Sequence, residues 1–314
     1  MNKKRTFFAY VVLGSKGFCM GASDVVPGVS GGTMAFILGI YEELILAIKS
    51  FDLKSLKLLL TLQFRAFFEH IAWKFLLTVG AGILTAIFTL ARLLAWLLHN
   101  TPVLIWSFFL GLILASVVTV SRRVQTWQPL TGVSLIIGLI GIYLLVGLAP
   151  STTPDDLWFL FLSGAVAICA MILPGISGSF ILVLMGKYQY ILEAVNDRNF
   201  LVLIVVAAGA GVGIAVFSRL LGWLLMRCHD LIVAFLTGLM LGSLRKVWPW
   251  KETLESMMDR HGNTVPLVQA NILPGCLDKE VFSALALMAA GFIAVILLDR
   301  MARRSPTIPE TLNP

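Results

Sequence analysis

Two short glycine-rich motifs are the parts of the sequence best suited to bind an anion. The first reads PGVSGGT (residues 27–33) and the second reads PGISGS (residues 174–179). Proline ends one helix and favours the start of the next, and glycine lets the backbone approach a ligand closely. The free amides at a helix start then attract an anion, aided by the helix dipole. The alternative is that these glycines only pack helices together.

The candidate substrate-binding residues of the two motifs are their prolines, glycines and hydroxyl residues. They are Pro27, Gly28, Ser30, Gly31, Gly32 and Thr33, with Pro174, Gly175, Ser177, Gly178 and Ser179.

Cations inside apolar segments are the second candidate group. Arg92 and Arg219 occupy matching places in two long apolar runs, and Lys16 and Lys187 are further cations in such runs. Charge within a bilayer is costly and marks function, and arginine binds phosphate in a bidentate manner. We therefore expect Arg92 and Arg219 to neutralise a bound phosphate. The alternative is that their side chains reach out to the membrane interface.

Carboxylates near the first motif are candidates for ion coupling. Asp24 precedes that motif, whereas Met171 holds the matching place before the second, and Glu42 follows the first motif. Asp24 and Glu42 could accept a coupling proton. Alternatively, Asp24 pairs with an arginine or caps the following helix, and Glu42 lies at the interface.

Signatures of enzyme chemistry are absent from the sequence. It contains no HExxH motif, no nucleophile elbow and no phosphate-binding P-loop, and its four cysteines show no CxxC spacing. We therefore expect no catalytic residue, no metal and no cofactor.

The elements that position these residues are membrane helices. Hydrophobic residues form 58% of the chain and charged residues 13%, whereas soluble domains carry about a quarter charged residues. A spanning helix needs about 20 apolar residues. The segments that meet this need are residues 75–98, 103–120, 130–149, 200–225, 231–244 and 281–298.

Two further apolar regions, residues 7–48 and 157–195, are interrupted by the motifs and resemble each other. The match continues downstream, where ARLLAWLL (91–98) corresponds to SRLLGWLL (218–225). This is the signal of an internal duplication. An odd number of spans separates the two broken regions, so the copies enter the membrane from opposite sides.

The predicted fold class is therefore an all-α integral membrane protein with inverted-topology repeats. Each repeat has a re-entrant helical hairpin, rather than two full spans, plus transmembrane helices. The predicted divisions are a first repeat (1–121), a linking helix (130–149), a second inverted repeat (156–247), an external loop (248–280), and a last helix with a cytoplasmic tail (281–314).

Charge sets the expected orientation. The net charge is +7, and most loop lysines and arginines fall on one side if both termini are cytoplasmic, as the positive-inside rule requires. We expect a multi-pass protein of a bacterial cytoplasmic (inner) membrane, with the phospholipid bilayer as partner and no nucleic acid.

The motifs resemble those of the polyprenyl-phosphate (undecaprenyl-phosphate) transporter family. The resemblance rests on GASDVVPGVSGGTMA (21–35) and MILPGISGS (171–179), and it covers residues 14 to 298. The second copy departs from the first, because Lys187 and Gln189 stand where the first has Ile40 and Glu42. This departure leaves Glu42 without a symmetric partner for coupling.

The resemblance implies a flippase rather than an enzyme. It would return undecaprenyl phosphate from the outer to the cytoplasmic leaflet by alternating access, for cell-envelope polysaccharide synthesis. The polyprenyl-phosphate lipid is then the partner, and a homo-oligomer is left open.

Two alternatives remain at this level. An undecaprenyl-pyrophosphate phosphatase-like enzyme also has inverted repeats and a Pro-Gly-x-Ser element, but its chemistry needs an arginine in that element and acidic and histidine partners. Neither motif contains an arginine. A transporter of a small soluble anion would use the same helix ends, in a site closed to the lipid.

Overall fold

The computed structural model describes residues 5–24, 30–148, 150–151, 153–258, 264–276 and 278–304. Pro27 and Gly28 lie outside these residues. The first half contains α1 (Phe7–Asp24), α2 (Gly31–Ile37), α3 (Tyr41–Lys49), α4 (Leu53–Leu60), α5 (Phe64–His70), α6 (Trp73–Asn100), α7 (Pro102–Ser121) and α8 (Pro129–Val146). The second half contains α9 (Leu157–Ile172), α10 (Gly178–Leu184), α11 (Tyr188–Asn196), α12 (Phe200–Arg227), α13 (His229–Val247), β1 (Lys251–Met258), β2 (Thr264–Asn271) and α14 (Lys279–Arg304).

Five of the described helices are long and apolar enough to cross a membrane. They include Trp73–Leu90 of α6, Pro102–Ser121, Pro129–Val146, Phe200–Arg227 and Lys279–Arg300. The pair α2 and α3 meets the same test together but is bent by 118°. These helices confirm the predicted all-α integral membrane protein. The described strands, β1 and β2, form an antiparallel hairpin within the segment predicted as an external loop.

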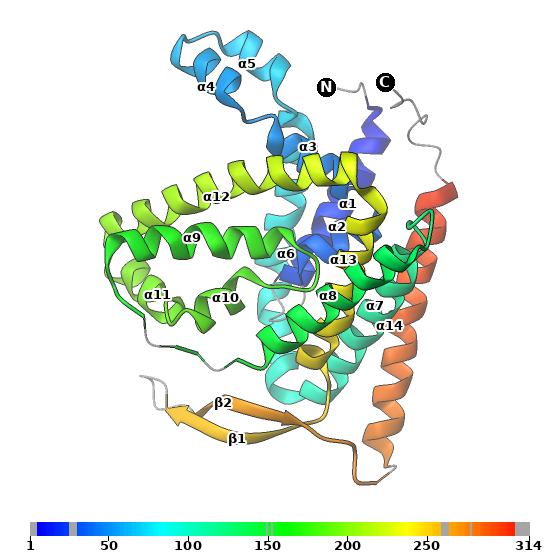
Figure 1. Cartoon of the computed structure of the whole chain (residues 1–314). Coiled ribbons are helices and arrows are strands. Elements are labelled where there is room, and N and C mark those ends of the chain that lie inside the picture. Colours follow the sequence, from blue (N-terminus) through cyan, green and yellow to red (C-terminus); the bar gives the residue numbers. More distant parts are fainter. Residues whose placement is uncertain are drawn as a thin grey trace.

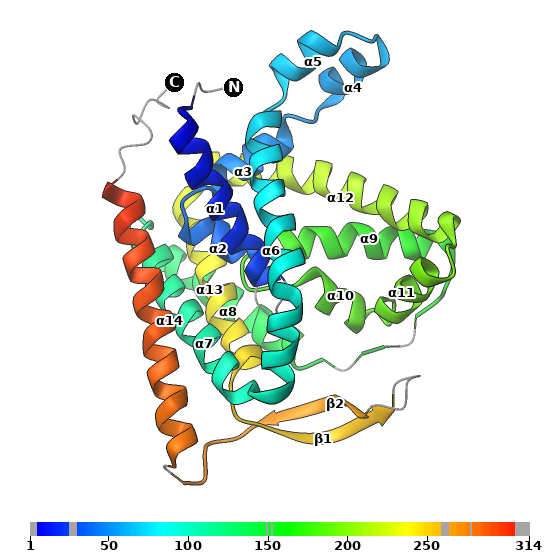
Figure 2. The same cartoon turned by 180° about the vertical axis from the view of Figure 1, so that it is seen from behind.

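Helices that are distant in sequence pack in four main pairs. α1 lies along α6 and α9 along α12, while α7 lies along α14 and α8 along α13 (Figures 1 and 2). The pairs α1–α6 and α9–α12 each lie within one half of the chain. The pairs α7–α14 and α8–α13 each join a helix of the first half to a helix of the second. The last helix of each half, α8 or α14, thus packs against a helix of the other half.

Glycines allow close backbone contact in these pairs, as is common between membrane helices. A methyl group on Gly82 of α6 would overlap the carbonyl oxygen of Gly14, and one on Gly209 of α12 would overlap that of Phe161. The two glycines occupy corresponding places in the repeated sequence.

The same correspondence holds for the other two helix pairs. Gly111 of α7 meets the carbonyl of Met288, and Gly238 of α13 meets the carbonyl of Leu135. The two halves therefore use the same helix contacts at corresponding positions.

The short helices that follow the two motifs differ in burial. Every residue of α2 is buried, whereas α10 buries only Gly178 and Ile181. Tyr41 at the start of α3 is 1% exposed, but its counterpart Tyr188 at the start of α11 is 43% exposed. The hairpin α2–α3 is inserted into the molecule, while the hairpin α10–α11 lies at its surface.

The two hairpins also differ in their neighbours and orientation. α3 packs against α12, and no comparable packing of α11 against α6 occurs within the described part of the chain. Figure 1 shows α9 and α12 side by side and running across the direction of α6 and α14. The two halves are thus alike in their internal packing but are placed differently in the molecule.

Candidate functional site

Residues at the start of α2 contact the break that follows α9. The Thr33 hydroxyl accepts a hydrogen bond from the Gly175 amide (2.9 Å), and the Ser30 hydroxyl donates to the Leu173 carbonyl (3.3 Å). A Cβ atom on Gly32 would lie 2.6 Å from the carbonyl oxygen of Ile172, so only glycine fits there. The contact therefore joins the two motifs directly.

Tyr41 reinforces this contact and was not predicted from the sequence as a site residue. Its hydroxyl donates to the carbonyl of Ile172 at 3.2 Å, and its ring stacks at a tilt on Phe36, with centroids 4.6 Å apart. The ring is carried inward by the sharp bend between α2 and α3, where Gly39 has a φ of +70°. Such a φ is in the left-handed region that favours glycine.

The first amides of α2 already have partners within the protein. The Asp24 carboxylate accepts from the Gly31 amide at 2.7 Å, and the Ser30 hydroxyl accepts from the Gly32 amide at 3.1 Å. Asp24 thus acts as a cap in this arrangement, as one reading of the sequence expects. A ligand can reach these amides only if Asp24 or Ser30 moves away.

The second break offers more accessible polar groups. Ser177 precedes α10 but makes no capping hydrogen bond to it; its hydroxyl lies 2.8 Å from that of Ser179, which is exposed. Pro174 and Gly175 are buried, and Gly175 has a φ of +84°. The hydroxyl pair is therefore the part of the two motifs best placed to receive a ligand.

An apolar cavity of about 260 Å³ lies beside the second break. Leu173, next to the break, forms part of its wall, and α12 and α13 provide the rest, including Phe217, Leu221 and Phe235. The lining is hydrocarbon, so the cavity suits an apolar group.

The predicted arginines do not contact the breaks among the described residues. Arg92 is exposed on α6, and the Arg219 guanidinium donates to the carbonyl of Phe51 at 3.4 Å.

The two lysines near the hairpins are engaged by the protein itself. Lys16 donates to the carbonyl of Leu38 at 2.8 Å, which fixes the bend of the first hairpin. Lys187 is 1% exposed and pairs with Asp155, donates to the carbonyl of Thr153 and lies 5.6 Å from the ring centre of Phe159. Lys187 therefore ties the second hairpin to the segment before α9.

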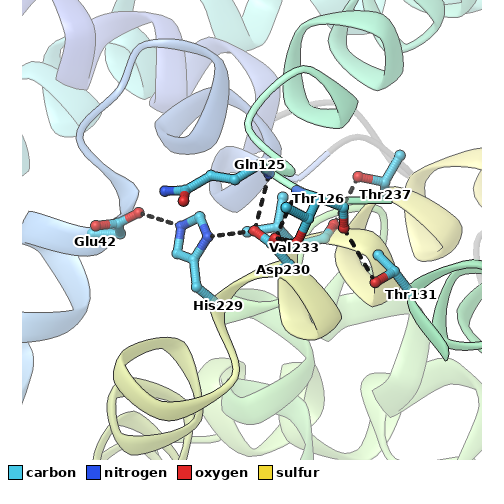
Figure 3. Close-up of polar contacts among 8 residues, drawn as sticks. All are labelled: Glu42, Gln125, Thr126, Thr131, His229, Asp230, Val233 and Thr237. Carbon is cyan, nitrogen blue, oxygen red and sulfur yellow. Dashed lines mark hydrogen bonds and ion pairs between the residues drawn. The ribbon is translucent and has the colours of Figure 1, made fainter. Parts of the chain in front are cut away.

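Glu42 lies in a polar cluster that joins three parts of the chain (Figure 3). Its carboxylate is 3.5 Å from Nε2 of His229, and Nδ1 of His229 is 3.3 Å from the Asp230 carboxylate. Asp230 accepts hydrogen bonds from the amides of Gln125 (3.1 Å) and Thr126 (2.9 Å) and from the Thr126 hydroxyl (2.9 Å). The bonds from these two amides, with that from the hydroxyl, hold the pKa of Asp230 well below its usual range.

His229 is a site residue that the sequence did not indicate. It stands just after α12, outside both motifs, and only the folded chain brings it to Glu42. Within the described residues, no group of three or more histidine, cysteine and carboxylate side chains is arranged to hold a metal ion.

Comparisons with known proteins agree with the motifs. A family model described as VCA0040-like, undecaprenyl phosphate translocase-like, matches residues 20–265. A polyprenyl-phosphate transporter of Vibrio cholerae is 44% identical over 295 residues, covering 92% of this chain and 96% of the relative. A polyprenyl-phosphate transporter of Staphylococcus aureus is 31% identical over 255 residues, covering 74% and 84%. No solved structure matches. The chain therefore belongs to the undecaprenyl phosphate translocase-like family of multi-pass membrane proteins.

Proposed function

We propose that this protein is a transporter, not an enzyme, which carries undecaprenyl phosphate or a related polyprenyl phosphate across the membrane. The observation that carries the proposal is the direct meeting of the two motifs, through Thr33 and Gly175 at 2.9 Å. The names of the two relatives support the choice of substrate. Broken helices that meet within a bundle are a common form of substrate site in transporters.

The phosphate first binds at the second break. Ser177 and Ser179 offer hydroxyls there, and the apolar cavity beside Leu173 takes the hydrocarbon next to the phosphate. When the breaks separate, Ser30, Thr33 and the amides of α2 become free and complete the site. Asp24 must then release the Gly31 amide, which makes it a candidate for proton coupling.

The two arginines enter this proposal as the cations that the phosphate meets on its way to the breaks. Arg92 and Arg219 sit on long apolar helices and remain at least partly accessible. A guanidinium on such a surface attracts a phosphate headgroup while the prenyl chain stays in lipid.

Transport proceeds by alternating access between two inverted repeats. The matched glycine contacts between α1 and α6 and between α9 and α12 support one rigid helix pair in each half. The different burial of the hairpins α2–α3 and α10–α11 supports two positions of a hairpin. In a bacterial cytoplasmic membrane with both termini inside, the carrier returns from the outer to the cytoplasmic leaflet. It is then available again for cell-envelope polysaccharide synthesis.

The test is direct binding of undecaprenyl phosphate to the purified protein in detergent. Inorganic phosphate and undecaprenyl pyrophosphate serve as competitors. The double variant Ser177→Ala/Ser179→Ala should lose binding, whereas Ser283→Ala, an exposed serine bonded only to its own helix, should not. Equal competition by inorganic phosphate would instead support a small-anion transporter, and phosphate release from the pyrophosphate would support an enzyme.

A further inference from the structure

We propose that His229 is a proton-binding latch, which holds the first hairpin closed through Glu42 while the ring carries two protons and releases it when the ring loses one. The latch joins α3 to the start of α13, and α3 lies toward the end of the molecule at which α1 begins and α14 ends (Figure 1). This inference rests on the proposed transport function, because it assigns the latch to one side of the transport path. It adds a residue outside both motifs to the transport machinery.

The geometry of the imidazole ring carries the inference (Figure 3). Nε2 faces the Glu42 carboxylate at 3.5 Å, and Nδ1 faces the Asp230 carboxylate at 3.3 Å. An imidazolium has a donor on each nitrogen, so it satisfies both carboxylates. A neutral ring has one donor and one lone pair, so one carboxylate must then face a lone pair and is repelled.

Glu42 is the partner that is released. Asp230 is fixed by the amides of Gln125 and Thr126 and by the Thr126 hydroxyl, whatever the charge on His229. The Glu42 side chain is 54% exposed and can turn to water. A neutral ring therefore keeps its proton toward Asp230 and loses the contact with α3.

The charged surroundings of the latch favour the protonated ring. Glu42 and Asp230 are the titratable groups that act on His229. Arg123, in the turn after α7, acts on Glu42 and stands over the ring of Phe36. Arg5 pairs with the neighbouring Glu43 at 2.6 Å, a bond that does not depend on a histidine.

The latch lies where the hairpin α2–α3 closes on the second half. α3 packs against α12, and Ile45 of α3 is 1% exposed, with its side chain 3.6 Å from the Cβ position of Gly222. Release of Glu42 removes a polar tie at the first turn of α3, just ahead of this apolar contact. Movement of α3 away from α12 would then expose Ile45.

The latch has no titratable counterpart in the other half. In the repeated sequence, Gln189 corresponds to Glu42, and Pro102 corresponds to His229. A change of pH therefore acts on one hairpin only. A one-sided proton switch gives the two ends of the transport path different responses to pH.

The sign of the pH dependence follows from the closed geometry. The hydrogen bond to Glu42 raises the pKa of His229 above its ordinary value of about 6.5, against the opposing effect of burial. The closed state gains stability from the proton, fully so below about pH 6.5, and this gain is lost as the pH rises through the raised pKa. The hairpin should therefore be closed at acidic pH and open at alkaline pH.

The experiment follows the exposure of position 45 with the full-length protein in detergent. Ile45→Cys is made in a background in which Cys19, Cys169, Cys228 and Cys276 are replaced. Its rate of alkylation by a water-soluble maleimide is measured from pH 5.5 to pH 9 and divided at each pH by the rate for the unfolded protein. This division removes the change in thiolate fraction with pH.

The expected result is a steady rise in the corrected rate from acidic to alkaline pH, with its midpoint above about pH 6.5, the ordinary pKa of histidine. His229→Gln and Glu42→Gln should each give a fast rate at every pH, and His99→Gln, at the far end of α6, should behave as the parent. A flat profile in the parent, or an unchanged profile in His229→Gln, would overturn the latch.

Binding of undecaprenyl phosphate to the same proteins separates this inference from the proposed function. A pH-dependent rate without lipid binding supports the latch and counts against the substrate. Normal lipid binding with a flat rate in the parent supports the substrate and overturns the latch.

Discussion

The hydroxyl of Thr33 accepts a hydrogen bond from the amide of Gly175 at 2.9 Å, across two helix breaks that belong to different halves of the chain. Both groups are buried, so each depends on the other for a polar partner. The bond is also easily exchanged, because a phosphate oxygen is an alternative acceptor for the same amide. A substrate phosphate can therefore replace the Thr33 hydroxyl as the acceptor for the Gly175 amide, and the bond between the two breaks would then be lost.

The first prediction concerns this bond. Thr33→Val keeps the shape of the side chain but leaves the buried Gly175 amide without its acceptor, which costs about 1–3 kcal/mol. The thermal midpoint in detergent should fall. Thr89→Val serves as the control, because the Thr89 hydroxyl is exposed and bonds only within α6. Equal midpoints for the two variants would show that the inter-break bond contributes nothing to stability.

The second prediction concerns the close approach of the two breaks. Gly32→Ala places a methyl group 2.6 Å from the carbonyl oxygen of Ile172, so the breaks must move apart. Uptake of undecaprenyl phosphate in proteoliposomes should be lost, and the protein should still be inserted in the membrane. Gly80→Ala on α6, where nothing lies within 4 Å, should transport normally. Normal transport by Gly32→Ala would show that the close contact between Gly32 and Ile172 is not needed for transport.

The third prediction tests the anchor of the second hairpin. Asp155→Asn takes the carboxylate from Lys187, whose side chain is almost wholly buried. The uncompensated ammonium should lower stability by about 1–2 kcal/mol, less than the roughly 3–5 kcal/mol typical of a fully buried pair, because Asp155 is 61% exposed. Denaturant or thermal unfolding measures the change.

The matched control for this variant is the next residue along the chain. Asp156→Asn alters an exposed carboxylate that makes no side-chain capping bond to α9, and it should leave stability unchanged. If both variants behave alike, Lys187 does not depend on Asp155.

The fourth prediction concerns orientation. With both termini cytoplasmic, Cys276 lies outside and the turn between α7 and α8 lies inside. A membrane-impermeant maleimide should label Cys276 in spheroplasts when the other cysteines are replaced. A cysteine introduced by Gln128→Cys in a cysteine-free background should react only after permeabilisation. The reverse pattern would invert the proposed direction of transport.

The helices of this protein are largely readable from its sequence. Apolar runs long enough to span a bilayer correspond to α6, α7, α8, α12 and α14, because burial in lipid demands continuous apolar composition. The two motifs mark real breaks before α2 and α10, since proline and glycine interrupt helices locally. The spanning helices and the two helix breaks could therefore be predicted from the residues within each segment.

The contacts made by polar side chains could not be read in the same way. Glu42 meets His229 only because the turn between α12 and α13 folds onto α3, and no local pattern records that approach. Lys187 stands in an apolar run of the sequence, and it can be buried there because Asp155 and the Thr153 carbonyl come to it from the preceding segment. Such partners depend on tertiary placement rather than on spacing along the chain.

The pairing of α7 with α14 has a consequence for how the protein is made. α7 is synthesised early, but the helix that covers Gly111 is α14, the last helix among the described residues. During translation, the glycine face of α7 therefore stands against lipid or an insertion factor until α14 leaves the ribosome. A chain truncated before Lys279 would keep that face bare, and Gly111 would then face lipid in place of the Met288 carbonyl.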